Sequence, residues 1–108
     1  MSNWKELGRH QEEFTEKLGR LLLYLFSIEA RPRLRDAYRD KRAFGEYGEQ
    51  GPTYGHPRST HKVGLAVDII VADNTLHEAG HDFWDLLGGS KRISEDMNHY
   101  SFEWEGIR

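Results

Sequence analysis

The stretch VGLAVDIIV, residues 63–71, constrains the fold of this chain more than any other segment. It is rich in β-branched residues and nearly continuous in apolar character, which is typical of a strand buried inside a small domain. A single charge interrupts it at Asp68. Because a carboxylate inside an apolar strand is costly to bury unless it is paired or bound to a metal, we expect Asp68 to have specific partners elsewhere in the chain.

The part of the chain before this strand predicts a helix, a short strand and a loop. Apolar residues recur at steps of three and four over the first thirty residues, which predicts an amphipathic helix that packs on the domain's own sheet. Pro32 ends this helix, and RLRDAYR at 33–39 alternates loosely enough to form a short strand. Glycines and prolines are dense between residues 43 and 58, which predicts a long surface loop of the kind that often borders a pocket.

The part of the chain after this strand predicts a second helix and a final strand. HDFWDLL at 81–87 predicts a short helix that ends at Gly88 and Gly89, and HYSFEW at 99–104 alternates as a strand does. The fold class expected from these elements is α+β. We expect a small antiparallel sheet covered by the N-terminal helix and the short second helix, with the functional site on one face of the sheet.

Length and composition set the broad class of protein. The 108 residues fit a single domain, spanning residues 1–108, and a hydrophobic share of 37% is enough to close one core. The formal charge of −3 provides no basic field for nucleic acid, so nucleic-acid binding is not expected. No cysteine is present, which excludes disulfides, thiolate zinc sites and cysteine nucleophiles. Any metal must therefore be held by histidines and carboxylates.

The N-terminal stretch MSNWKELGRHQEEF lacks the apolar segment of a signal peptide, and no run of the chain reaches the length of a membrane span. We therefore expect a protein that is made in the cytoplasm without a signal peptide and does not insert into the membrane.

His61 is the first candidate partner of Asp68. An extended chain between the two residues would span on the order of 20 Å, whereas two ligands of one ion lie only a few Å apart. Gly64 lies between them and tolerates backbone angles that other residues avoid, so a turn there would bring His61 back over Asp68. From these residues alone, a metal site, a buried salt bridge and a hydrogen-bonded pair all remain open.

The residues around His61 and Asp68 favour the metal site over the salt bridge and the hydrogen-bonded pair. STHKVGLAVD matches the pattern S-x-H-x-x-G-x-A-x-D at its five defined positions, which are Ser59, His61, Gly64, Ala66 and Asp68. This pattern resembles that of the M15 family of zinc peptidases, which includes D-alanyl-D-alanine carboxypeptidases, dipeptidases and phage L-alanyl-D-glutamate endopeptidases. The resemblance extends over roughly residues 33–104.

The resemblance implies a zinc site on the sheet. In the family, a histidine near the C-terminus completes the ligand set and follows an acidic residue by three positions, and DMNH provides both as Asp96 and His99. His61, Asp68 and His99 are therefore the implied ligands of Zn²⁺. Two imidazoles and one carboxylate occupy three of the positions around zinc and leave the fourth for water. The alternative for His99 is a histidine of the core.

Three residues take other roles in the implied reaction. Asp96 would accept the proton of the attacking water and pass it to the leaving amine. DAYR at 36–39 resembles the family's strand with a substrate-binding arginine, so Arg39 is implied to bind substrate and to offset the charge of the tetrahedral oxyanion. Ser59 is implied to orient substrate or a ligand. The alternatives are a solvated loop acid at Asp96, a surface charge at Arg39 and a turn residue at Ser59.

HEAGH at 77–81 matches the H-E-x-x-H signature of another class of zinc protease. That signature needs a stable helix with both histidines on one face, followed by a third ligand. Gly80 lies inside the required helix, and the preceding ADNT is typical of a turn. Glu103 is a conceivable third ligand, but no second long helix accompanies it. We therefore expect His77 and His81 to lie in a loop and at a helix start, outside the metal site.

The function expected from the resemblance is that of a zinc metallopeptidase acting on peptidoglycan. The segment NHYSFEWEG resembles the end of short phage lysis proteins, and this resemblance favours a phage endolysin that cuts between L-alanine and D-glutamate of the stem peptide. D-alanyl-D-alanine carboxypeptidase activity is the alternative among enzymes. The alternative of another class is a non-catalytic wall-binding or virion-structural module that zinc stabilises. We expect a monomer that is made in the host cytoplasm and reaches the cell wall after release.

Overall fold

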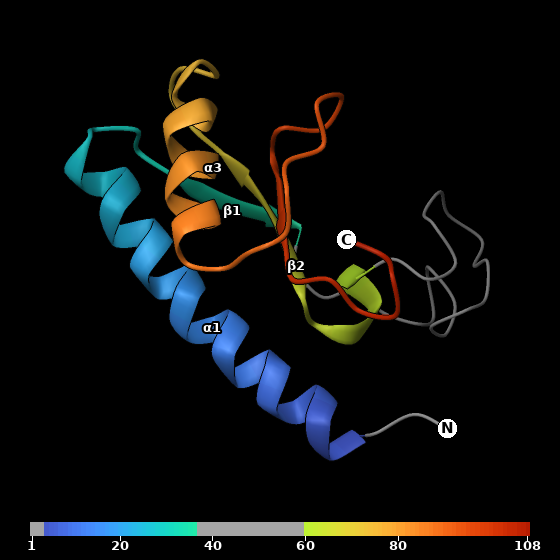
Figure 1. Ribbon diagram of the computed structural model, residues 1–108. Helices are drawn as coiled ribbons and strands as arrows, with labels where there is room; N and C mark the ends of the chain where they lie inside the picture. Colours follow the sequence, from blue (N-terminus) through green and yellow to red (C-terminus); the bar gives the residue numbers. More distant parts are fainter. Residues whose placement is uncertain (1–3, 37–59) are drawn as a thin grey trace.

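The computed structural model describes residues 4–36 and 60–108 (Figure 1). Arg39 and Ser59 lie outside these described residues. The helices are α1 (Trp4–Ser27), the short 3-10 helix η1 (Thr60–Val63) and α3 (Leu76–Leu86). The strands are β1 (Arg33–Asp36), β2 (Ala66–Ile70) and β3 (His99–Ser101).

The strands of the described part form one antiparallel sheet in the order β1-β2-β3. Strand β2 is therefore the central strand, which accounts for its continuous apolar character. Val67 and Ile69 of β2 are buried, while Asp68 between them is partly exposed on the opposite face. The α+β class and the antiparallel sheet are confirmed.

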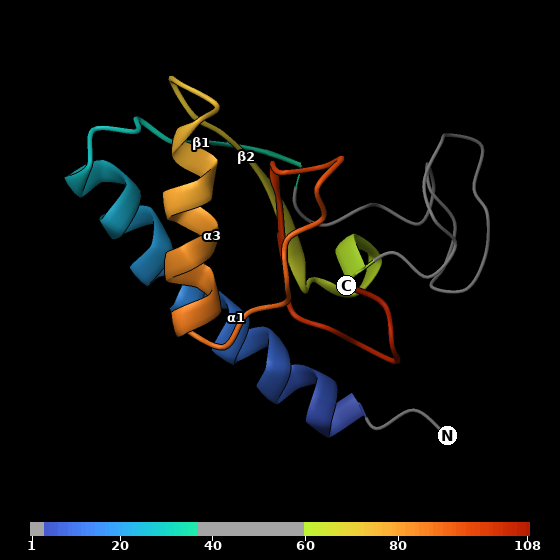
Figure 2. The same cartoon turned by 45° about the horizontal axis from the view of Figure 1, so that its top comes forward.

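Helices α1 and α3 lie side by side on one face of this sheet, as Figures 1 and 2 show from two directions. Tyr24 of α1 stacks on Phe83 of α3 with ring centroids 4.3 Å apart. Trp84 of α3 and Tyr100 of β3 are fully buried beneath them and contact edge to face. The core is thus closed between the helix pair and one face of the sheet.

The apolar stripe of α1 is the reason this segment is a helix that packs on the sheet. The residues that α1 buries recur at helical spacing, so they share one face. They are Leu7, Phe14, Leu21 and Leu25. The helix ends at Ser27, ahead of Pro32, where Glu29 and Arg31 adopt positive φ angles of 61° and 51°. The end of α1 is therefore a left-handed turn, and Pro32 follows it instead of causing it.

Helix α3 begins at Leu76, so the prediction of a helix over 81–87 placed its start too late. Gly80 was expected to disfavour a helix here. A Cβ atom at this position would lie 2.6 Å from the Tyr100 hydroxyl and 3.3 Å from Leu25. Gly80 thus permits close packing of α3 on β3 and α1, and that packing outweighs the low helix propensity of glycine.

The remaining elements are shorter than predicted. Strand β2 occupies the centre of residues 63–71, since Val63 belongs to η1. Strand β3 ends at Ser101 instead of Trp104, which forms an isolated bridge with Ile107. Strand β1 covers the first half of the predicted segment, and residues 37–39 lie outside the described residues.

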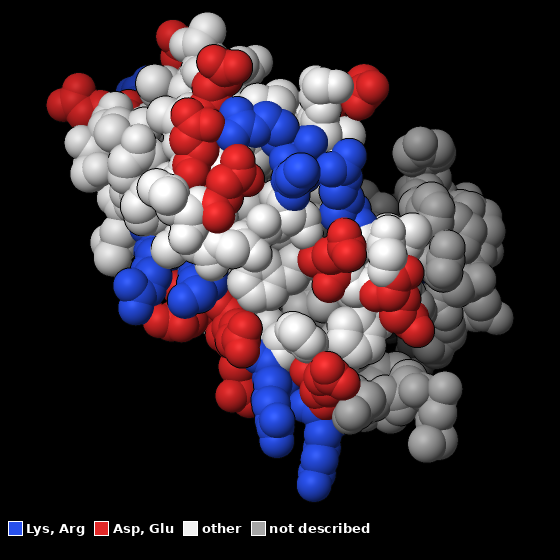
Figure 3. Space-filling model, in the orientation of Figure 1, with Lys and Arg blue, Asp and Glu red and all other residues white. Residues whose placement is uncertain are grey.

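Acidic and basic side chains are interspersed on the face of the molecule shown in Figure 3. The Arg92 guanidinium lies 2.7 Å from Asp82 and 3.0 Å from Asp85. Among residues 4–36 and 60–108, no helix has both the length and the apolar character needed to cross a membrane.

Candidate metal centre

The turn between η1 and β2 returns His61 to the start of the central strand. Gly64 has a φ of 70°, in the left-handed region that glycine adopts without strain. The Leu65 amide donates to the Thr60 carbonyl at 2.9 Å and closes the turn. Gln11 of α1 donates from its side chain to the Val63 carbonyl at 2.7 Å, which ties the turn to the long helix. The bend predicted at Gly64 is confirmed.

The register of β2 and β3 brings the other two side chains together. Asp68 and His99 are direct partners across the antiparallel pair. Side chains of such partners lie on the same face of a sheet with their Cβ atoms close. The Ile69 amide also donates to the Asn98 carbonyl at 2.9 Å, which extends the pairing into the turn before β3.

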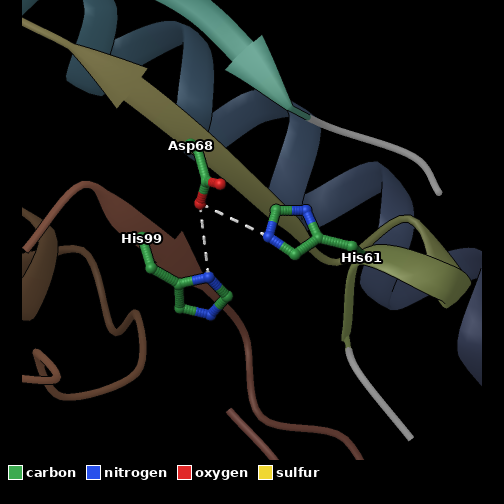
Figure 4. Close-up of side chains that lie close together, drawn as sticks. All are labelled: His61, Asp68 and His99. Atoms are coloured by element: carbon green, nitrogen blue, oxygen red, sulfur yellow. Dashed lines mark ion pairs between the residues drawn. The ribbon is translucent and has the colours of Figure 1, made fainter. Parts of the chain in front are cut away.

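His61, Asp68 and His99 converge on one point (Figure 4). One potential ligand atom from each residue lies within 4.8 Å of those of the other two. Asp68 Oδ1 lies 3.4 Å from His61 Nε2 and 3.6 Å from His99 Nδ1. The two imidazole rings meet edge to face with centroids 5.1 Å apart. Within the part of the chain that the structure describes, these three side chains are close enough to hold a metal ion together. They are called the ligand cluster below.

Burial and electrostatics both fit a cation at this point. The His61 and His99 side chains are only 2% and 9% exposed, while that of Asp68 is 23% exposed. Burial raises the pKa of Asp68, but the His61 and His99 side chains outweigh burial and hold this pKa below its ordinary value. Asp68 therefore remains an ionised carboxylate at neutral pH, as a metal ligand must.

Buried atoms without hydrogen bonds provide a separate test of whether these residues fit a metal. Within the described residues, the buried Asp68 Oδ1 forms no hydrogen bond, and its close contacts are the ion pairs with His61 and His99. A buried acceptor without a partner normally costs free energy. A metal ion between the three side chains would take up the lone pair of Asp68 Oδ1. The donor set and its geometry thus fit a divalent cation.

Asp96 lies on the turn that precedes β3, and its side chain is exposed. The Asp96 amide donates to the Ile93 carbonyl at 2.8 Å, and the His99 amide donates to the Asp96 carbonyl at 3.1 Å. This last bond makes residues 96–99 a compact turn that carries Asp96 and His99 together. Arg39 and Ser59, the other two predicted site residues, lie outside the described residues.

The prediction that His77 and His81 lie in a loop and at a helix start was wrong, because both are inside α3 and 1% exposed. His77 Nδ1 is 2.7 Å from the Tyr100 hydroxyl, and His81 Nε2 is 2.7 Å from the Met97 carbonyl. Glu78, which would be the base of an H-E-x-x-H site, is exposed. Among the residues that the structure describes, none of the three joins the cluster of potential ligands.

A sequence signal for this longer helix existed. Leu76, Phe83, Trp84 and Leu87 follow one another at helical spacing, so the apolar stripe already begins before His81. Gly80 occupies the same stripe at the point of closest packing. The stripe was a better guide to the helix than the propensity of its one glycine.

Comparisons of the chain with protein-family models, with curated proteins and with solved structures find no match. A function for this chain is therefore inferred from its own residues and their geometry.

Proposed function

We propose that this protein is a zinc-dependent peptidoglycan peptidase that cuts the L-alanyl-D-glutamate bond of stem peptides, as phage endolysins of the M15 type do. The convergence of His61, Asp68 and His99 on one face of the sheet is the observation that carries this proposal. The three residues come from three different elements, η1, β2 and β3. The fold, and not their closeness in sequence, therefore brings their side chains together.

The ligand chemistry favours zinc among the common cations. Zinc accepts imidazole nitrogen together with carboxylate oxygen, whereas Ca²⁺ and Mg²⁺ favour sets made of oxygen ligands. Three protein ligands are also the usual number in catalytic zinc sites, which keep one position open. When bound, zinc would supply Lewis acidity and lower the pKa of water at the site.

The chain's own residues supply the remaining functions of a peptidase. Asp96 follows from the proposal as the general base, since its exposed carboxylate is carried by the same turn as His99. It would accept the proton of the attacking water and return it to the leaving amine. We propose that Arg39 binds a carboxylate of the stem peptide and that Ser59 orients the substrate, both by their match to the M15 pattern.

Digestion of purified peptidoglycan by the full chain tests this function. Mass spectrometry of the released fragments should show new N-terminal D-glutamate, because this residue follows the proposed bond. His61→Ala should release none, whereas His10→Ala should act as the wild type does. His10 is a suitable control because it is a histidine of α1 outside the cluster of ligands, with a side chain 38% exposed.

Other outcomes would replace the proposal. Release of terminal D-alanine alone would identify a D-alanyl-D-alanine carboxypeptidase. A chain that binds zinc, binds peptidoglycan and cleaves no bond would be a zinc-stabilised wall-binding or structural module. A chain that cleaves equally well after His61→Ala would show that the cluster is not the active site.

A further inference from the structure

His77 and His81 are buried imidazoles that neither the ligand cluster nor the proposed reaction uses. We infer that His81 is a positioning residue, which holds the turn at residues 96–99 so that Asp96 and His99 face the metal centre. This inference rests on the proposed function, because the turn matters only if His99 is a ligand and Asp96 acts on substrate.

The bond from His81 to the turn has a defined direction. His81 Nε2 lies 2.7 Å from the Met97 carbonyl oxygen. A carbonyl can only accept, so Nε2 carries the proton and donates it. His81 Nδ1 is buried and has no hydrogen-bond partner within the described residues, so a proton on it would lack an acceptor. His81 is therefore a neutral imidazole in one tautomer, held in place as a donor.

Met97 occupies the middle of the turn that this bond supports. On one side, the His99 amide donates to the Asp96 carbonyl at 3.1 Å. On another, the Ile69 amide of β2 donates to the Asn98 carbonyl at 2.9 Å. The His81 bond adds an attachment from α3, so the turn is fixed to both layers of the fold. Its loss would free the Met97 carbonyl, at the middle of the turn, from α3.

His81 is itself held rigidly. Its ring stacks on that of Tyr100 with centroids 4.1 Å apart and planes 9° from parallel. The Tyr100 hydroxyl contacts His77 Nδ1 at 2.7 Å, and Gly80 lets α3 approach this hydroxyl closely. Tyr100 directly follows His99 in β3. Both histidines of HEAGH thus contact the segment that carries the third potential ligand, one through the Met97 carbonyl and one through the Tyr100 hydroxyl.

Three variants of the full chain test the role of His81. His81→Phe keeps a ring against Tyr100 but removes the donor, and His81→Gln keeps an N–H donor of similar reach. Trp84→Phe is the matched control, because Trp84 Nε1 donates from the same helix to the Ser101 carbonyl at 3.0 Å, beyond the turn. Zinc affinity would be measured by chelator competition, and unfolding would be followed by circular dichroism.

We expect His81→Phe to weaken zinc binding on the order of 10-fold, the scale seen when residues that orient metal ligands are removed. His81→Gln should restore most of this loss. Trp84→Phe should lower the unfolding temperature without changing zinc affinity, which separates a positioning role from general stability. With Co²⁺ in place of zinc, the visible spectrum of His81→Phe should differ from that of the wild type and of His81→Gln.

Equal zinc affinity in His81→Phe and the wild type would overturn the inference. So would an equal loss in Trp84→Phe. A wild-type chain that binds no zinc would instead overturn the proposed function. If His81→Phe does not fold, the wild type still gives a test by long-range ¹H–¹⁵N spectra of its histidines. A protonated Nε2 and bare Nδ1 at His81 are expected, and the opposite tautomer would contradict the bond to Met97.

Discussion

Asp68 and Asp96 lie in different surroundings, which suit the two carboxylates to the different roles proposed for them. Asp68 lies in the central strand, where two imidazoles hold its pKa below the ordinary value, so it is ionised and suited to bind a cation. Asp96 is exposed on the turn before β3, where a substrate and water can reach it. Surroundings alone therefore favour Asp68 as the ligand and Asp96 as the base.

Asp96→Asn tests the proposal that Asp96 is the base and not a ligand. The amide keeps the shape of the carboxylate but cannot accept the proton, so turnover should fall by about 10²- to 10⁴-fold, the usual contribution of general acid–base catalysis. Zinc content and folding should not change. The neighbouring exposed acid gives the control, since Glu95→Gln should cleave peptidoglycan as the wild type does. Cleavage at the wild-type rate by Asp96→Asn would make Asp96 only a loop acid.

At the scale of the elements, α3 shows how packing can outweigh helix propensity. Its one internal glycine faces Tyr100, whose hydroxyl is fixed by His77, and its two histidines are buried. The low helix propensity of Gly80 and the burial of two titratable rings would both be unfavourable in an isolated helix. They are tolerated because close contact with β3 and α1 depends on them.

Gly80→Ala should therefore destabilise the protein although alanine is the better helix former. The new Cβ would lie 2.6 Å from a buried hydroxyl that cannot move freely, and overpacking of this kind costs about 1–3 kcal/mol. Gly19→Ala in α1 is the control. It adds a Cβ where nothing lies within 4 Å, and should stabilise the protein by roughly 0.5–1 kcal/mol. Urea unfolding of both variants measures the difference, and equal effects would contradict the packing described for α3.

The buried histidines of α3 also predict how stability depends on pH. Burial lowers the pKa of His77 and of His81 below the ordinary value of 6.5, and weaker interactions offset this only in part for each. Below pH 6.5 the unfolded chain binds protons that the folded chain does not, so the free energy of unfolding should fall as the pH is lowered. Asp68 does not contribute in this range, because its folded pKa lies below the ordinary 3.8.

Urea unfolding at pH 7.5, 6.5 and 5.5 measures this dependence. A chelator removes bound metal beforehand, so that metal release does not contribute to the change in stability. His81→Gln should show a shallower loss of stability than the wild type, because it removes one of the two groups. An identical pH dependence in the two proteins would show that His81 does not remain neutral in the folded chain.

At the scale of the whole molecule, the pattern of residues in the sequence predicted the sheet and the ligand cluster better than the helices around them. The apolar run with one charge predicted a buried strand and a carboxylate with partners elsewhere in the chain, and Gly64 predicted the bend that returns His61. Both depend on local chemistry. The position of α3 depends on contacts with Tyr100 and Leu25, which lie far away in sequence. The low helix propensity of Gly80 therefore led to a predicted start of the helix that was too late.

The same limit applies to the site. The spacing of Asp96 and His99 could be read from the sequence, but the support of their turn by His81 could not, because that bond joins two elements whose packing had to be known. The predicted roles of Arg39 and Ser59 concern residues outside the described part and stay predictions.

The proposed function requires one metal ion held by η1, β2 and β3 together. The zinc content of the purified chain, measured by elemental analysis, tests this most directly. The wild type and His10→Ala should each carry about one zinc per chain, as three protein ligands at one centre require. His61→Ala, Asp68→Ala and His99→Ala should each carry almost none. Full zinc in all three variants, or none in the wild type, would contradict the proposed zinc site.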